Sequence, residues 1–168
     1  MISPEHARLM AAYNAWQNRS LYEAAEGLEP AARDADRGAF FGSITATLTH
    51  LLWADRVWMN RLAGDPPPRM RSIADSVREV EAWAELRAAR AAQDARIREW
   101  ADGLTAQALA GTLSWHSGAL GRSLSRPVWV VVAHLFNHQT HHRGQVHAML
   151  TAAGARPGDT DLVFMPGM

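Results

Sequence analysis

Apolar residues recur along much of the chain at the spacing of an α-helix. In the first thirty residues, Leu9, Tyr13, Trp16 and Leu21 fall on one helical face, as in an amphipathic helix that buries one side against a core. Further segments show the same period, which distinguishes helices from strands. The pattern predicts four helices, over residues 4–27, 43–63, 72–102 and 127–153.

Residues that start helices stand at three of the predicted beginnings. Ser3 precedes a proline, and a serine cap followed by proline in the first turn is a common helix start. Ser43 is placed to cap the second helix, which a glycine and three successive prolines end. Ser72 has Asp75 three residues later, which resembles a capping box. We therefore expect the third helix to begin at Ser72.

Two segments lack the helical pattern. We expect residues 29–38 to form a polar loop. Three glycines interrupt residues 104–126, where residues 112–115 and 120–125 suit two short strands joined by a turn at 117–118. The sequence thus predicts an all-α four-helix bundle with a short β-hairpin between the third and fourth helices.

Length and composition indicate one domain. The chain has 168 residues, of which 48% are hydrophobic and 20% charged, and a chain of this length supports one substantial core. Its longest apolar stretch, around residues 128–132, is far too short to span a bilayer. The first ten residues resemble no signal peptide. We expect a cytoplasmic protein with no membrane partner.

Missing residue types and charge balance exclude several kinds of chemistry. The chain has no cysteine, and all seventeen of its basic residues are arginine. Thiolate nucleophiles, thiolate metal sites and lysine Schiff bases are therefore excluded, and any metal must be held by nitrogen or oxygen. The net charge is zero, so we expect no nucleic-acid partner.

Five of the eight histidines lie between residues 134 and 147. At about 100° per residue, His134, His138 and His142 share one helical face with apolar residues. Histidines four residues apart can direct two nitrogens at one metal ion. The pairs 134/138 and 138/142 have the same spacing, so geometry leaves the choice between them open.

A third ligand must come from another helix. His50 lies on an apolar face of the second predicted helix, from which it can reach the fourth. Single histidines on such faces are more often core residues bonded to the main chain, but three packed together each need a partner, which favours a metal. His141 and His147 fall toward the edge and the opposite face. We expect both to be solvated or interfacial.

Three longer motifs resemble one protein family: YNAWQN at 13–18, RGAFFGSITATLTHLLWADRVWMNRL at 37–62, and NHQTHHRGQ at 137–145. Together they resemble the DinB branch of the DinB/YfiT-like superfamily. The resemblance implies a metal site formed by His50, His138 and His142, with His134 as a neighbour.

The resemblance also implies an activity. Members of the superfamily include transferases that use low-molecular-weight thiols, so we expect a metal-dependent thiol transferase acting on a small electrophile. The alternatives are a metal-dependent hydrolase and a non-catalytic protein with a structural metal. Three protein nitrogens leave coordination positions open, which favours catalysis. Imidazole ligands suit zinc or nickel, and also iron or copper.

Expectations also follow for Asp55, for Gln145 and for a second apolar face of the last helix. Asp55 falls among leucines and must find a partner, which we expect to be an arginine or a group on the first helix. Gln145 shares the face of His138 and either orients a ligand or packs. Trp129, Phe136 and Leu150 form a second apolar face on the last helix, which predicts a homodimer or a covering C-terminal tail.

Overall fold

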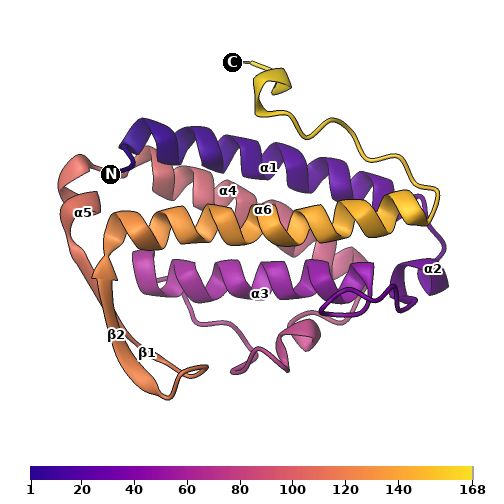
Figure 1. The fold of residues 1–168 in the computed structure, drawn as a ribbon, viewed down its shortest axis with the longest axis horizontal. Coiled ribbons are helices and arrows are strands. Elements are labelled where there is room, and N and C mark those ends of the chain that lie inside the picture. Colours follow the sequence, from indigo (N-terminus) through magenta and orange to yellow (C-terminus); the bar gives the residue numbers. More distant parts are fainter. Residues whose placement is uncertain (168) are drawn as a thin grey trace.

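The computed structural model describes residues 1–167, which are mostly helical. Within them lie six α-helices, two short 3-10 turns and one two-stranded antiparallel sheet (Figure 1). The helices are α1 (Pro4–Glu26), α2 (Pro30–Asp34), α3 (Ile44–Ala63), α4 (Trp83–Asp102), α5 (Ala106–Ala110) and α6 (Val128–Ala152), and the strands are β1 (Thr112–Ser117) and β2 (Arg122–Pro127).

The four long helices pack side by side. Helix α1 contacts α4 and α6, and α3 contacts α6 and α4, so that each long helix touches two others (Figure 1). Their apolar faces form two core clusters. One cluster includes Leu21, Leu48 and Val146, and the other includes Met59 and Leu135.

A buried polar layer accompanies the two apolar clusters. Asp55 on α3 is fully buried and accepts a hydrogen bond of 2.7 Å from Arg90 on α4, so the expectation of an arginine partner is confirmed. Burial raises the pKa of the Asp55 carboxyl, and the positive charge of Arg90 opposes that rise. Arg143 on α6 donates to Asn14 on α1. Burial lowers the pKa of Arg143 to about 10.

Two predicted helix starts are confirmed. The Ser3 hydroxyl accepts from the His6 amide, and the Ser43 hydroxyl accepts from the Ala46 amide. Each bond satisfies an amide that has no partner inside its helix. Gly64 then ends α3 in the left-handed conformation, with φ of 74°, which a glycine adopts without steric cost.

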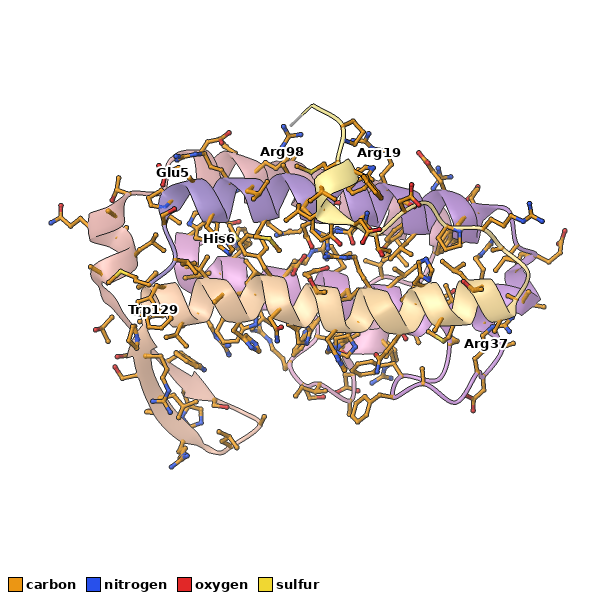
Figure 2. All side chains as sticks on the ribbon, turned by 45° about the horizontal axis from the view of Figure 1, so that its top comes forward. Glu5, His6, Arg19, Arg37, Arg98 and Trp129 are labelled. Atoms are coloured by element: carbon orange, nitrogen blue, oxygen red, sulfur yellow. The ribbon has the colours of Figure 1, made fainter. Side chains whose placement is uncertain are left out.

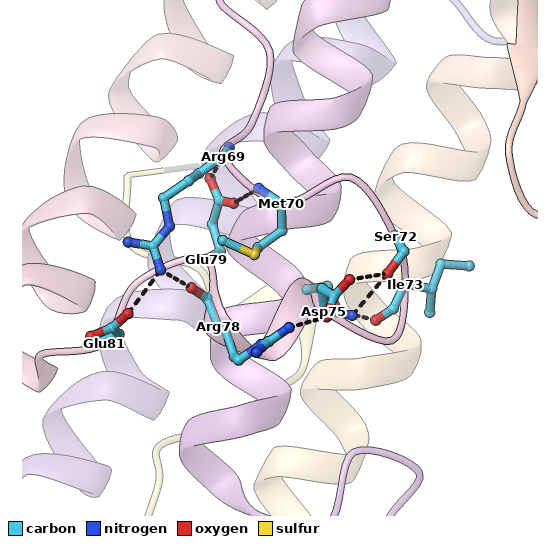
Figure 3. Close-up of polar contacts among 9 residues, drawn as sticks. Arg69, Met70, Ser72, Ile73, Asp75, Arg78, Glu79 and Glu81 are labelled. Carbon is cyan, nitrogen blue, oxygen red and sulfur yellow. Dashed lines mark hydrogen bonds and ion pairs between the residues drawn. The ribbon is translucent and has the colours of Figure 1, made fainter.

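The predicted start of the third helix is wrong. Helix α4 begins at Trp83, and residues 64–82 form an irregular loop with a 3-10 turn at Ser76–Arg78. Ser72 and Asp75 do exchange hydrogen bonds, but they close a turn within this loop. The Glu79 carboxylate accepts from the backbone amides of Arg69 and Met70 (Figure 3). These bonds fold the loop back on itself, which a continuous helix could not do.

Two short helices were missed, and the hairpin is confirmed. Helix α2 lies inside the predicted loop 29–38, where Pro30 occupies the first turn. Helix α5 is capped by Thr105, whose hydroxyl accepts from the Ala108 amide. The strands pair in antiparallel register, with Trp115 opposite Leu124.

The residues of the predicted second apolar face of the last helix are packed within the chain itself. Phe136 is 3% exposed and Leu150 fully buried, each inside a core cluster, and Trp129, at the start of α6 (Figure 2), packs against one of those clusters. The C-terminal tail instead follows α1, where Tyr13 donates to the Thr160 carbonyl. The homodimer is therefore no longer supported by an uncovered apolar face on α6, and it stays a prediction.

No helix in the described part of the chain is both long enough and apolar enough to cross a membrane.

Candidate metal centre

Three histidines from two helices meet near the middle of α3 and α6. His50 projects from α3, and His138 and His142 project from successive turns of α6. One ring nitrogen from each lies within 4.8 Å of the other two, and the Nε2 atoms of His50 and His138 are 3.4 Å apart. The packing of α3 against α6 therefore groups the three residues that the resemblance implied.

Ser76 fixes the His50 ring. Its hydroxyl lies 2.8 Å from His50 Nδ1 and donates a 2.6 Å hydrogen bond to the Ile73 carbonyl. Because the hydroxyl proton is committed to that carbonyl, Ser76 accepts from the ring, and Nδ1 carries the proton. The lone pair of His50 Nε2 is then directed toward the other two histidines.

Gln145 fixes the His142 ring in the same way. Its Oε1 lies 2.7 Å from His142 Nδ1, and an amide oxygen can only accept. His142 therefore donates from Nδ1 and keeps a lone pair on Nε2. Partners of this kind hold metal-binding histidines in the correct tautomer and orientation. Of the two roles expected for Gln145, orienting a ligand is the one that this contact supports.

The electrostatics keep the rings neutral. Burial, together with the neighbouring histidines, lowers the pKa of His50 and of His138 to about 3. Neutral imidazole is the form that coordinates a metal. Two nitrogen lone pairs facing each other at 3.4 Å repel unless a proton or a cation lies between them. The donor set of three neutral imidazoles fits a divalent transition metal.

The Phe41 ring and a cavity both border the three-histidine group. Phe41 stacks on the His50 ring with centroids 3.9 Å apart and also lies 5.5 Å from the His142 ring. A cavity of about 820 Å³ reaches His50 and His138. It is lined by residues of α3, the loop 64–82, the hairpin and the first half of α6. A small molecule in this cavity can approach the histidine nitrogens.

The comparison with protein families agrees with this arrangement. The model of the DinB family matches residues 1–168. The chain belongs to the DinB family. No curated protein matches it.

The other histidines of this DinB family protein stand outside the group. His134 lines the same cavity, with its ring 5.7 Å from that of His138, and it packs edge-on against Trp58. His141 is exposed and His147 half-buried. The structure thus groups the 138/142 pair with His50, and it places His134 as the neighbour that the resemblance implied.

Two residues of the site escaped the sequence interpretation. The sequence predicts Ser76 inside a long helix, whereas it lies in a 3-10 turn with its hydroxyl 2.8 Å from His50 Nδ1. Phe41 lies two residues before the helix cap and nine residues before His50, and nothing in its local pattern predicts that its ring stacks on that histidine. Both contacts depend on tertiary structure.

Proposed function

We propose that this DinB family protein binds one divalent transition metal through His50, His138 and His142, and that it transfers a low-molecular-weight thiol to a small electrophile. The observation that carries the proposal is the convergence of three neutral ring nitrogens beside a cavity of about 820 Å³. A purely structural site has no need of such access. We also propose that the whole chain is one four-helix-bundle domain.

The composition supports an external thiol. The chain has no cysteine, so a sulfur nucleophile must enter with a substrate. When bound, a divalent metal supplies the Lewis acidity that lowers the pKa of a coordinated thiol or water. In the transfer, the thiol gives its proton to solvent, its sulfur bonds to the electrophilic carbon, and the leaving group departs with the bonding electrons.

The protein's own residues position the reactants. Ser76 and Gln145 hold two rings in the tautomer that directs Nε2 inward. Trp53, Trp58 and Trp115 line the cavity and give it an apolar wall against which a substrate can pack. Among the described residues that line the cavity there is no aspartate or glutamate, so no carboxylate general base contacts a substrate there. This favours thiol transfer over hydrolysis that depends on a carboxylate base.

Cobalt substitution tests the proposal. Protein without an affinity tag is loaded with Co²⁺ and titrated with N-acetylcysteine, using N-acetylserine as the matched control that lacks sulfur. The proposal predicts a new sulfur-to-cobalt absorption band with the thiol alone, absent from the His142→Ala variant. An unchanged spectrum at saturating thiol would contradict thiol transfer, and hydrolysis of ester substrates in its place would establish the hydrolase alternative.

A further inference from the structure

The cavity beside the histidines carries an unbalanced positive charge. Its lining includes Arg61, Arg71 and Arg126 but, among the described residues, no acidic side chain. The chain as a whole has seventeen basic and seventeen acidic residues, so this is a local excess. It adds to whatever positive charge a metal ion would bring to the other end of the cavity.

Arg61 is the cation that the fold holds in place. It lies in the last turn of α3, with its guanidinium carbon 4.6 Å from the ring centre of Trp58 and 5.6 Å from that of Trp115. Arginine stacked on aromatic rings in this way is restrained without losing its donors. Arg61 also lines the cavity, so its guanidinium offers N–H donors to a ligand there.

Nothing in the described part of the chain neutralises Arg61. The described ion pairs include Arg56 with Glu79, Arg90 with Asp55 and Arg96 with Asp65, and none involves Arg61. Burial alone lowers the pKa of Arg61, in contrast to the paired Arg90, whose acidic neighbours raise its pKa. A half-buried guanidinium without a counter-ion gains from an anion that enters the cavity.

The rest of the cavity suits an apolar ligand body. A row of rings leads from the three-histidine group to Arg61. The His134 ring lies 5.7 Å from the His138 ring and 5.1 Å from the Trp58 ring, on which Arg61 stacks. On helix α3, Trp58 lies eight residues after His50, which corresponds to roughly 12 Å along the helix axis. An extended, flat molecule fits this length and these aromatic walls.

From this charge and shape we infer that the cavity binds an organic carboxylate with an apolar, aromatic-sized body, whose carboxylate pairs with Arg61 and whose other end lies at His50 and His138. The function of that other end rests on the proposed thiol transfer. The binding of the carboxylate does not, because Arg61 and the tryptophans hold it without a metal.

A matched pair of ligands isolates the charge. Binding of naphthalene-2-acetate and of its neutral analogue naphthalene-2-acetamide is followed by quenching of tryptophan fluorescence in the full chain. Measurements are made on the protein as purified and again after a chelator has removed metal. A charge-assisted hydrogen bond contributes roughly 1.5–3 kcal/mol, so the metal-free protein is expected to prefer the carboxylate by at least about tenfold.

Variants assign the preference to one side chain. Arg61→Gln is expected to bind both ligands within about twofold of each other, while its affinity for the amide stays that of the unaltered protein. Retained amide binding shows that the cavity is intact. Arg61→Lys keeps part of the preference. Arg8→Gln, on the exposed face of α1 where Arg8 pairs with Glu5, keeps all of it.

The outcomes separate this inference from the proposed function. Equal binding of the two ligands by the unaltered metal-free protein, or an undiminished preference in Arg61→Gln, overturns the carboxylate site. Failure of the cobalt protein to bind thiol overturns the transferase proposal and leaves an Arg61-dependent preference standing. Absence of binding by both naphthalene ligands overturns the inference as well.

Discussion

Replacing Ser76 by alanine tests whether the loop 64–82 prepares a histidine for metal binding. The Ser76 side chain is fully buried and accepts from His50 Nδ1 at 2.8 Å. Without this acceptor, the His50 ring can move its proton to Nε2 or rotate, and either change removes the lone pair that is directed toward the other two histidines. The loss of such an orienting partner typically weakens metal binding tenfold to a hundredfold, which is about 1.4–2.8 kcal/mol.

The same substitution also acts on stability, and this effect must be measured separately. Ser76 donates to the Ile73 carbonyl at 2.6 Å, and that carbonyl also accepts from the amide of residue 76, so alanine removes one of its two hydrogen bonds and leaves His50 Nδ1 without a partner. An unsatisfied buried group costs about 1–3 kcal/mol. Urea unfolding of the metal-free protein measures this cost and shows the conditions under which the variant is folded.

The decisive assay is competition for zinc against a chromophoric chelator, under conditions where each protein is folded. Ser72→Ala is the matched control, because it removes the hydrogen bonds to Asp75 in the same loop without touching a histidine. We expect Ser72→Ala to bind zinc within about twofold of the unaltered protein. Gln145→Leu removes the acceptor of His142 and should weaken zinc binding in the same range. Zinc affinity unchanged in folded Ser76→Ala would refute the reasoning.

Three further predictions concern stability. Asp55→Ala removes one of the two carboxylates that pair with the buried Arg90 and leaves Asp94 as its remaining partner, so we expect a loss toward the lower end of about 3–5 kcal/mol in urea unfolding, and a loss under 1 kcal/mol would contradict the importance of this pair. In the metal-free protein, the pKa of His50 and of His138 is about 3, below the ordinary 6.5. The unfolded chain therefore binds more protons than the folded chain between pH 6.5 and 3. As the pH is lowered through that window, the free energy of unfolding should decrease by up to about 1.4 kcal/mol per pH unit for each ring. Above pH 7 these rings should make stability neither rise nor fall with pH. His50→Phe should reduce the dependence of stability on pH between 6.5 and 3, and an unchanged dependence in that variant would contradict the assignment. Tyr13→Phe removes the 2.6 Å hydrogen bond to the tail and should cost about 0.5–1.5 kcal/mol; stability equal to that of the unaltered protein would show that the tail is not held there.

The long helices could be predicted because their signals are local. Ser3 and Ser43 cap helices through amides three residues away, so the caps are visible in the sequence. The hairpin was predictable for the same reason, from glycines and short apolar runs. Helices α2 and α5 have five residues each, too few for a periodic pattern to emerge.

The third helix shows where local signals mislead. Ser72 and Asp75 form the hydrogen bonds of a capping pair, yet only a short 3-10 turn follows and no α-helix begins there. The competing bonds come from Glu79, whose carboxylate pairs with Arg56 on α3 and with two loop amides. These partners lie far enough along the chain that only the folded structure brings them together.

The site, too, could be predicted only in part from local signals. Helical spacing placed three histidines on one face but could not choose between the 134/138 and 138/142 pairs, because both have the same geometry. The choice depends on which turn of α6 lies beside His50, and the packing of α3 on α6 determines this. The partners Ser76 and Phe41, and the charge of the cavity around Arg61, depend on loop and hairpin positions that no periodic pattern encodes.

Elemental analysis of protein purified without an affinity tag tests the central claim most directly. The account predicts one divalent transition-metal ion per chain, lost in each of His50→Ala, His138→Ala and His142→Ala and retained in His134→Ala and His141→Ala. Folding of every variant is checked by circular dichroism. Metal retained at full stoichiometry by the folded His50, His138 and His142 variants, or absent from the unaltered protein after incubation with zinc or nickel, would contradict the account.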